Sequence, residues 1–249
     1  SGDHQKASEY FSQSLALLET LIGPEHPDVA VIAGNAGSAA MANGDTARAL
    51  ELVTRALELT RRIRGEEHPE IARLTNNLAA IHSRIGEYAQ ALELQMKALV
   101  LRRKLLGQAN ADTANSACNT GDALLNLGRP AEARGYFGEA LAAFASTLGE
   151  ANPRYGTALA YRGIADARLG KLKPGIAAIE RGIAIMVATP DPPLQHLGDA
   201  RFGLAQALWP RDRARALAQA RQARDHYLNV GPGSVLELAR ADAWLAAHR

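Results

Sequence analysis

Glycines recur every 42 residues in two interleaved series, and this repeat constrains the possible fold more than any other feature of the sequence. The first series is Gly23, Gly65, Gly107 and Gly149, and the second is Gly2, Gly44, Gly86, Gly128 and Gly170. Two series with the same period predict one structural unit that is stacked repeatedly along the chain.

Each unit is predicted to be a hairpin of two helices. Proline follows the first glycine series at Pro27, Pro69 and Pro153, and the first turn of a helix tolerates proline because the N–H there has no helical partner. Glycine suits the end of the preceding helix, where a left-handed backbone is favoured. The first helices are expected at 27–43, 69–85, 111–127 and 153–169, and the second helices at 45–64, 87–106, 129–148 and 171–188.

Small residues keep the same period inside these helices. They occupy one position of every first helix, at Gly37, Ala79, Gly121 and Gly163, and one of the second helices, at Ala49, Ala91 and Ala133. A glycine within a helix costs about 1 kcal/mol relative to alanine. Its recurrence therefore predicts that the two helices of a hairpin approach closely at this position.

The repeat divides the chain, which we expect to be a single domain over 1–249. A half unit at 2–22 precedes full units at 23–64, 65–106, 107–148 and 149–190. The pattern loosens over 191–230, a degenerate unit with helices expected at 195–209 and 212–229, and 234–248 is expected to be a capping helix. Because the sequence begins at the turn within a unit, we expect it to be a fragment whose uncapped first helix is open to a second copy.

Composition excludes several classes of protein. Hydrophobic residues make up 47% of the sequence and no segment alternates polar and apolar residues, which favours an all-helical chain. The net charge of +2 argues against a nucleic-acid binder. Cys118 is the single cysteine, so no internal disulfide is possible, and no apolar run approaches the roughly 20 residues of a membrane span. We therefore expect a cytoplasmic location.

The residues of the second full unit resemble the tetratricopeptide repeat. That motif favours the residue types found here at Leu78, Ala79, Gly86, Tyr88, Ala91 and Ala98. The 42-residue period and the segment 67–79 are similar to the subclass typified by kinesin light chains. This resemblance implies an all-α fold, a right-handed α-solenoid (superhelix) of helical hairpins with a concave groove.

The end of the chain also resembles the C-terminal repeat region of bacterial serine/threonine kinases, on the residues at 207–212 and 239–248. No kinase signature occurs in the sequence: it has no glycine-rich phosphate loop, no His-Arg-Asp and no Asp-Phe-Gly.

Asparagine recurs at Asn35, Asn77 and Asn119, and Tyr161 takes the fourth place in this series. A helix interior disfavours asparagine by several tenths of a kcal/mol, so its recurrence calls for a reason. The amides could link neighbouring helices. Alternatively, they could bind the backbone of a peptide, since an amide both donates and accepts hydrogen bonds. The kinesin light-chain resemblance implies the second role. The other groove positions that the motif implies include Arg73, Asn76, Ser83, Arg84, Asn115, Asp122, Asn126 and Arg168.

No catalytic site is expected. His82 is expected to be a satisfied core histidine and Cys118 a buried thiol, and no His, Cys, Asp or Glu pattern matches a metal site. We therefore expect a scaffold without catalytic residues, metal or cofactor that binds a protein or peptide segment in its groove. The alternative is a regulatory region of a larger signalling enzyme, such as a serine/threonine kinase, that acts by intramolecular contact or oligomerisation.

Overall fold

The computed structural model describes residues 2–248, and over this range it contains helices and turns but no strand. The chain divides into two compact units, of which unit 1 ends at Leu105 and unit 2 begins at Leu106. The fold is an all-α solenoid built from helical hairpins. Its handedness and its expected organisation as one domain stay predictions.

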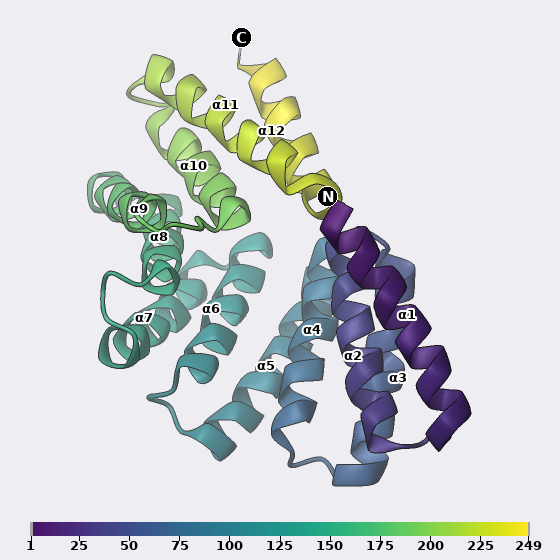
Figure 1. Ribbon diagram of the computed structural model, residues 1–249. Coiled ribbons are helices and arrows are strands. Elements are labelled where there is room, and N and C mark those ends of the chain that lie inside the picture. Colours follow the sequence, from purple (N-terminus) through teal and green to yellow (C-terminus); the bar gives the residue numbers. More distant parts are fainter. Residues whose placement is uncertain (1, 249) are drawn as a thin grey trace. The chain divides into compact units, whose positions relative to one another are not determined.

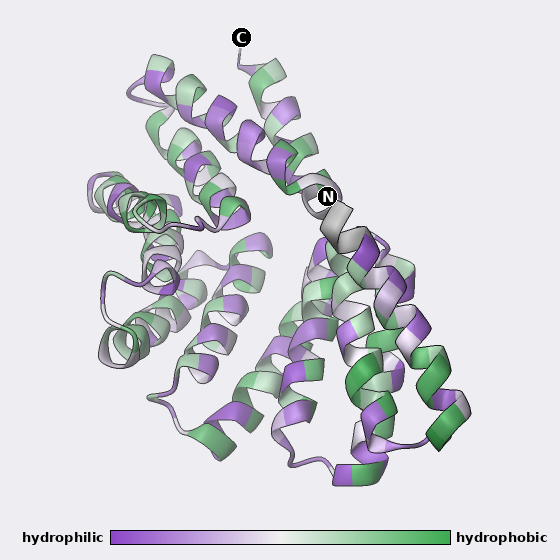
Figure 2. Ribbon diagram, viewed as in Figure 1, coloured by the Kyte–Doolittle hydropathy of each residue, from purple (hydrophilic) through white to green (hydrophobic). Residues whose placement is uncertain are grey.

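Unit 1 contains the first helices of the chain: α1 (Gly2–Ile22), α2 (Pro27–Ala42), α3 (Thr46–Arg64), α4 (Pro69–Arg84) and α5 (Tyr88–Leu106). Each of the helices α1 to α4 packs against the next one along the chain, and α2 also contacts α4 (Figure 1). Their core includes Val29, Leu52, Val53 and Leu74, all of which are fully buried. Hydrophilic and hydrophobic residues alternate along each of these helices (Figure 2).

Unit 2 contains the remaining helices: α6 (Ala111–Asn126), α7 (Pro130–Thr147), α8 (Pro153–Arg168), α9 (Leu172–Val187), α10 (Leu194–Leu208), α11 (Arg213–Val230), the short 3-10 helix η1 (Gly231–Ser234) and α12 (Val235–Ala247). The hairpins α6–α7, α8–α9 and α10–α11 follow a curved path, with α6, α8 and α10 on its inner side (Figure 1). Phe137, Phe144, Ile179 and Met186 fill its core.

The predicted helices are confirmed, and each bound differs by at most one residue from its expected position. The glycines at both turns of the full repeats have positive φ: Gly23, Gly44, Gly65, Gly86, Gly107, Gly128, Gly149 and Gly170. This backbone conformation is strained for residues with a Cβ atom. The repeat thus encodes the turn geometry as well as the helix lengths.

A side chain caps the first helix of every full repeat at a spacing of 42 residues. The Nδ1 atoms of His26 and His68 accept hydrogen bonds from the backbone N–H two residues on, at 3.2 Å in both cases. The amide oxygens of Asn110 and Asn152 do the same at 2.8 and 2.9 Å. These caps satisfy backbone donors that a helix start leaves without partners.

The recurring small residues allow the close approach that was predicted. A Cβ atom at Gly37 would lie 2.6 Å from Val53 Cγ2, and one at Gly163 would lie 2.7 Å from the carbonyl oxygen of Gly175. His82 is buried, with Nδ1 2.6 Å from Oε2 of Glu87, which confirms its core position. No helix within residues 2–248 has both the length and the apolar composition of a membrane span.

Candidate functional site

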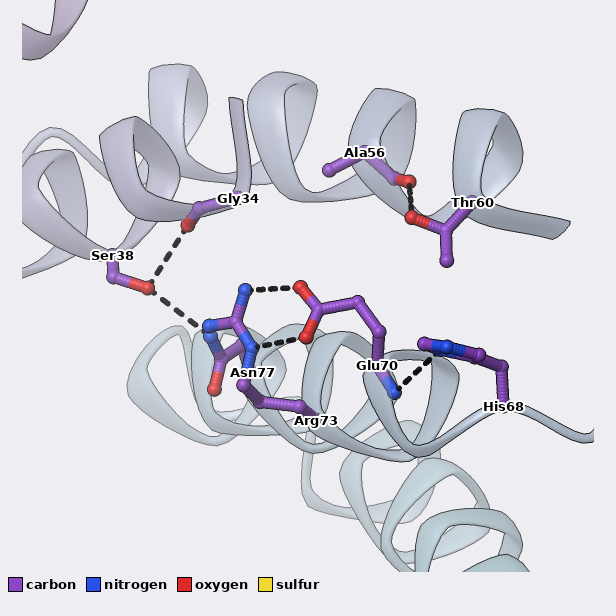
Figure 3. A network of polar contacts seen from close by, with 8 residues as sticks. All are labelled: Gly34, Ser38, Ala56, Thr60, His68, Glu70, Arg73 and Asn77. Carbon is purple, nitrogen blue, oxygen red and sulfur yellow. Dashed lines mark hydrogen bonds and ion pairs between the residues drawn. The ribbon is translucent and has the colours of Figure 1, made fainter. Parts of the chain in front are cut away.

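Polar side chains from α2 and α4 meet in unit 1 on a surface that we call the amide face, defined by Asn35, Ser38, Arg73 and Asn77. The Nδ2 atom of Asn77 donates a hydrogen bond to Ser38 Oγ at 3.1 Å, and this hydroxyl donates to the carbonyl oxygen of Gly34 at 3.0 Å (Figure 3). All four side chains are half-buried. Asn77 therefore links the two helices while its own carbonyl oxygen accepts no hydrogen bond in this network.

Asn35 lies one turn before Ser38 on α2, so both side chains share one side of the helix. Among residues 2–248 the Asn35 amide has no hydrogen-bond partner. Two of the predicted asparagines thus lie on adjacent helices of unit 1, one with an unused amide and the other with an unused oxygen.

Arg73, the fourth residue of the amide face, is held in place by Glu70. Its guanidinium donates two hydrogen bonds to Glu70, at 2.9 and 2.5 Å, and these bonds raise the pKa of Arg73 above its ordinary value. A Cβ atom at Gly34 would lie 3.1 Å from Arg73 Nη2. The absence of a side chain at Gly34 therefore leaves room for the Arg73 guanidinium close to α2.

A hollow adjoins the amide face where α2 and α4 begin. Its lining includes the apolar side chains of Val31 and Ile63 and the ring of His68. Val31 is 40% exposed and lies one turn before Asn35 on α2. The hollow also has a polar side, formed by Thr60, Arg64 and Glu70, and its apolar part lies one helical turn from the Asn35 amide.

The other predicted residues of unit 1 lie on α4. Asn76, Ser83 and Arg84 are half-buried. Arg84 donates a hydrogen bond from Nη1 to the carbonyl oxygen of Met41 at 2.9 Å, so it ties α4 to the end of α2.

Unit 2 carries a second polar surface, which we call the inner face and define by Asp122, Asn126, Tyr161, Arg168 and Asp199. Tyr161 lies at its centre. Its hydroxyl donates to Asp199 Oδ2 at 2.7 Å and lies 2.9 Å from His196 Nδ1. Since the hydroxyl proton goes to Asp199, we assign the proton of this second hydrogen bond to His196 Nδ1.

Burial shifts the pKa values of the titratable groups at the centre of the inner face. It raises the pKa of Asp199 and lowers the pKa of His196. Tyr227 of α11 donates a second hydrogen bond to Asp199, at 2.9 Å. The pKa of the Tyr161 hydroxyl lies well above its ordinary value because burial and the nearby carboxylates disfavour a phenolate.

The surroundings of Asp122 on α6 disfavour its ionised form. Burial, followed by the charges of Asp199 and Glu237, raises its pKa to about 7, against the opposing effects of Arg168 and Arg240. An acid with this pKa lowers the stability of the fold at neutral pH. Such groups are common at binding and catalytic sites, although structural networks also contain them.

Asn126 and Arg168 complete the inner face. Asn126 donates hydrogen bonds to Asp122, at 3.1 Å to its carbonyl oxygen and at 3.3 Å to Oδ1. It also accepts one from Nη1 of Arg240 in α12, at 3.3 Å. Arg168 donates to the carbonyl oxygen of Leu125 at 2.6 Å. Asn115 and Asn119 are half-buried on the same helix, α6.

Sequence reasoning missed four polar residues of this region: Asp199 and His196 on α10, and Glu237 and Arg240 on α12. The fifth hairpin has lost the 42-residue register, so no repeated position pointed to them. One signal was present for Asp199, because it is an acid between Gly198 and Ala200, which are both buried.

Cys118 is buried as predicted, and burial raises the pKa of its thiol. A thiol in this state is a poor nucleophile. Within the described part of the chain, no three His, Cys, Asp or Glu side chains come together in a way that could hold a metal ion.

A family model of the tetratricopeptide repeat matches residues 28–104 and 70–146. Residues 28–146 therefore match the tetratricopeptide repeat. A search of curated proteins found no match.

Several solved structures share the fold at low sequence identity. BtubC (BKLC) from P. vanneervenii is 18% identical, with a TM-score of 0.67 and 91% of each chain covered. A putative kinesin light chain from Podosopora anserina with TPR-like repeats is 20% identical, with a TM-score of 0.61 over 83% of this chain and 98% of that one. A Rap protein complexed with Competence and Sporulation Factor is 17% identical, with a TM-score of 0.67 over 100% and 72%. At these identities the likeness concerns the fold alone.

Proposed function

We propose that this tetratricopeptide repeat protein is a scaffold without catalytic activity that binds a peptide or protein segment. The observation that carries the proposal is the pair of incompletely used amides of Asn35 and Asn77 on the adjacent helices α2 and α4. An extended peptide offers an N–H and a C=O at every residue, and these two amides can pair with both kinds of group.

The surroundings of the amides support the same interpretation. The hollow lined by Val31 and Ile63 can receive an apolar side chain while the backbone of the ligand pairs with Asn35. Backbone pairing supplies affinity, and a pocket supplies the preference for particular side chains. We therefore expect ligands with an apolar residue next to the segment that contacts the amide face.

The inner face of unit 2 is the second proposed contact surface. Asn119 occupies the repeat position of Asn35 and Asn77, and Asn115, Asp122 and Asn126 lie on the same helix. The Rap structure with a related fold is a complex with Competence and Sporulation Factor. This likeness supports partner binding by the fold and names no partner for this chain.

A substitution in the hollow tests the proposal. Peptides selected from a random library on the parent chain serve as the probe, and their affinity is measured for Val31→Asp and for Val100→Asp. Val100 is exposed on α5, outside the hollow, so it is the matched control. We expect Val31→Asp to weaken binding at least tenfold and Val100→Asp to leave it unchanged. Equal affinities for both variants would contradict a contact at the hollow.

The alternative is a regulatory region of a larger signalling enzyme, such as a kinase, that binds its own catalytic domain or forms oligomers. The same selection separates the two proposals. Peptides that bind the free chain with micromolar affinity favour an external partner. Peptides that match only segments of the longer protein itself favour the intramolecular role.

A further inference from the structure

The C-terminal helix α12 contacts two surfaces of unit 2. On one side it packs against α10 and α11, and on the other it directs Glu237 and Arg240 toward the inner face. Arg240 Nη1 donates to Asn126 Oδ1 of α6 at 3.3 Å, across 114 residues of sequence. The negative charge of Glu237 and the positive charge of Arg240 both act on Asp122. The helix therefore contacts the inner face at Asn126.

The packing of α12 is light compared with that of its neighbours. Ala241 is its only buried residue, whereas the neighbouring helices α10 and α11 bury eight and four residues. Val235 and Leu236 remain exposed. Segments with few buried contacts open locally at a lower free energy than the core of the same protein.

Two kinds of contact hold α12. Ala241 and Leu238 pack in a small buried cluster with Ala223, Tyr227 and Phe202, and further contacts are aromatic or ionic. The ring of Trp244 meets the rings of Phe202 and Trp209 edge-on, with centroids 6.2 and 5.4 Å apart. Asp242 forms an ion pair with Arg224 of α11 at 2.6 Å, and both side chains are exposed. An exposed ion pair adds little stability, so the apolar contacts of Leu238, Ala241 and Trp244 contribute most of what these contacts supply.

Two charged residues of α12 have opposite effects on Asp122. The positive charge of Arg240 lowers the pKa of Asp122. The negative charge of Glu237 raises it. The acids Asp122, Asp199 and Glu237 face the bases Arg168 and Arg240, together with the ring of His196. A ligand that brings its own cation to Asp122 can replace Arg240 at this position.

We infer that α12 is a detachable lid on the inner face of unit 2, which opens to admit a partner to Asp122 and Asn126. This inference rests on the proposed function in one respect, namely that a partner uses the inner face. The opening itself does not depend on a ligand, so it is tested without one.

Amide hydrogen exchange of the parent chain gives the first measurement. We expect the amides of 235–247 to exchange at least about tenfold faster than those of α11, because the lid opens while α11 stays folded. Equal protection of the two helices would overturn the inference. The measurement requires no variant, so it holds whether or not a substituted chain folds.

Thiol labelling gives the second measurement. Asp122→Cys is introduced in a Cys118→Ser background, and its rate of reaction with a maleimide is compared with and without Trp244→Ala. We expect Trp244→Ala to raise the rate at position 122 about tenfold or more. Ala142→Cys, on the exposed side of α7, is the control and should react at one rate in both backgrounds.

Each outcome of the labelling experiment decides the question. An unchanged rate at position 122 would show that α12 does not cover the inner face, and it would leave the proposed function untouched. A rise at both positions would show general unfolding and would also count against a lid. A failure of peptides to bind at all would contradict the proposed function and leave the lid standing.

Discussion

Asn77 on α4 donates its amide N–H to the hydroxyl oxygen of Ser38 on α2, at 3.1 Å. This bond gives one of the recurring asparagines a structural role. The amide of Asn35, at the equivalent position of the preceding repeat, makes no such bond among the described residues. The structural role considered for the series therefore applies to Asn77, and peptide binding by Asn35 stays a prediction.

The difference between these asparagines predicts different effects on stability. Asn77→Ala loses a hydrogen bond of about 0.5–1.5 kcal/mol and regains a few tenths from helix propensity. We expect a net loss of roughly 0.5–1 kcal/mol in the free energy of unfolding. Asn35→Ala should be neutral or stabilising by up to about 0.5 kcal/mol. Urea denaturation followed by circular dichroism measures both, and equal losses would show that Asn35 has a structural partner too.

Two helical glycines give a matched test of the packing. Gly163→Ala places a Cβ atom 2.7 Å from a carbonyl oxygen and 2.9 Å from the nitrogen of Ile179, so it should destabilise unit 2 by about 1–3 kcal/mol. Gly138 has nothing within 4 Å of the same point, and Gly138→Ala should stabilise α7 by roughly 0.5–1 kcal/mol. Thermal unfolding compares the two variants. A neutral Gly163→Ala would contradict the close approach of α8 and α9.

The periodic part of the sequence predicted the fold in detail. Glycine, proline and small residues at fixed spacing determine where each helix begins, ends and touches its partner, because turns and close contacts have strict steric requirements. The helices predicted at 153–169 and 171–188 lie within one residue of α8 (Pro153–Arg168) and α9 (Leu172–Val187).

The inner face of unit 2 was predicted only in part. Asp122, Asn126, Tyr161 and Arg168 follow the repeat, but their partners do not. The contact between Arg240 and Asn126 depends on how strongly the stack curves, and a repeat pattern gives the contacts between neighbours rather than the cumulative curvature. Contacts between distant repeats therefore had no counterpart in the sequence analysis.

The pKa of Asp122 predicts a pH-dependent effect of Asp122→Asn. In the folded chain this pKa is about 7, above the ordinary value of 3.8. The folded state therefore holds the proton more tightly, and the parent loses stability as the pH rises from about 4 to about 7. Asn cannot ionise, so the variant should exceed the parent by about 1–3 kcal/mol at pH 8, at up to 1.4 kcal/mol for each unit of pKa shift.

Urea denaturation at pH 4.5 and pH 8 measures this difference. The advantage of the variant should shrink to about a quarter at pH 4.5 and vanish only below about pH 3.8, where the unfolded chain is protonated as well. A difference that is the same at both pH values would show that Asp122 ionises normally.

Helix α1 is expected to be the least protected part of unit 1. Leu15 is its one buried residue within 6–22, while Tyr10, Leu17 and Leu21 are each at least 60% exposed. Amide exchange in dilute solution should be faster in α1 than in α3, because few apolar contacts hold it. If a second copy covers this side, protection of α1 should rise with protein concentration, and sedimentation should show a dimer.

The central claim is tested most directly by the affinity of library-selected peptides for the triple variant Asn35→Ala, Asn77→Ala and Asn119→Ala. Each lost amide contact of about 0.5–1.5 kcal/mol should weaken binding by roughly three- to tenfold. We predict that the triple variant loses micromolar binding and keeps the helicity of the parent, since alanine favours helices. Unchanged affinity in a variant that is folded would contradict recognition by the asparagines and would place the binding surface elsewhere.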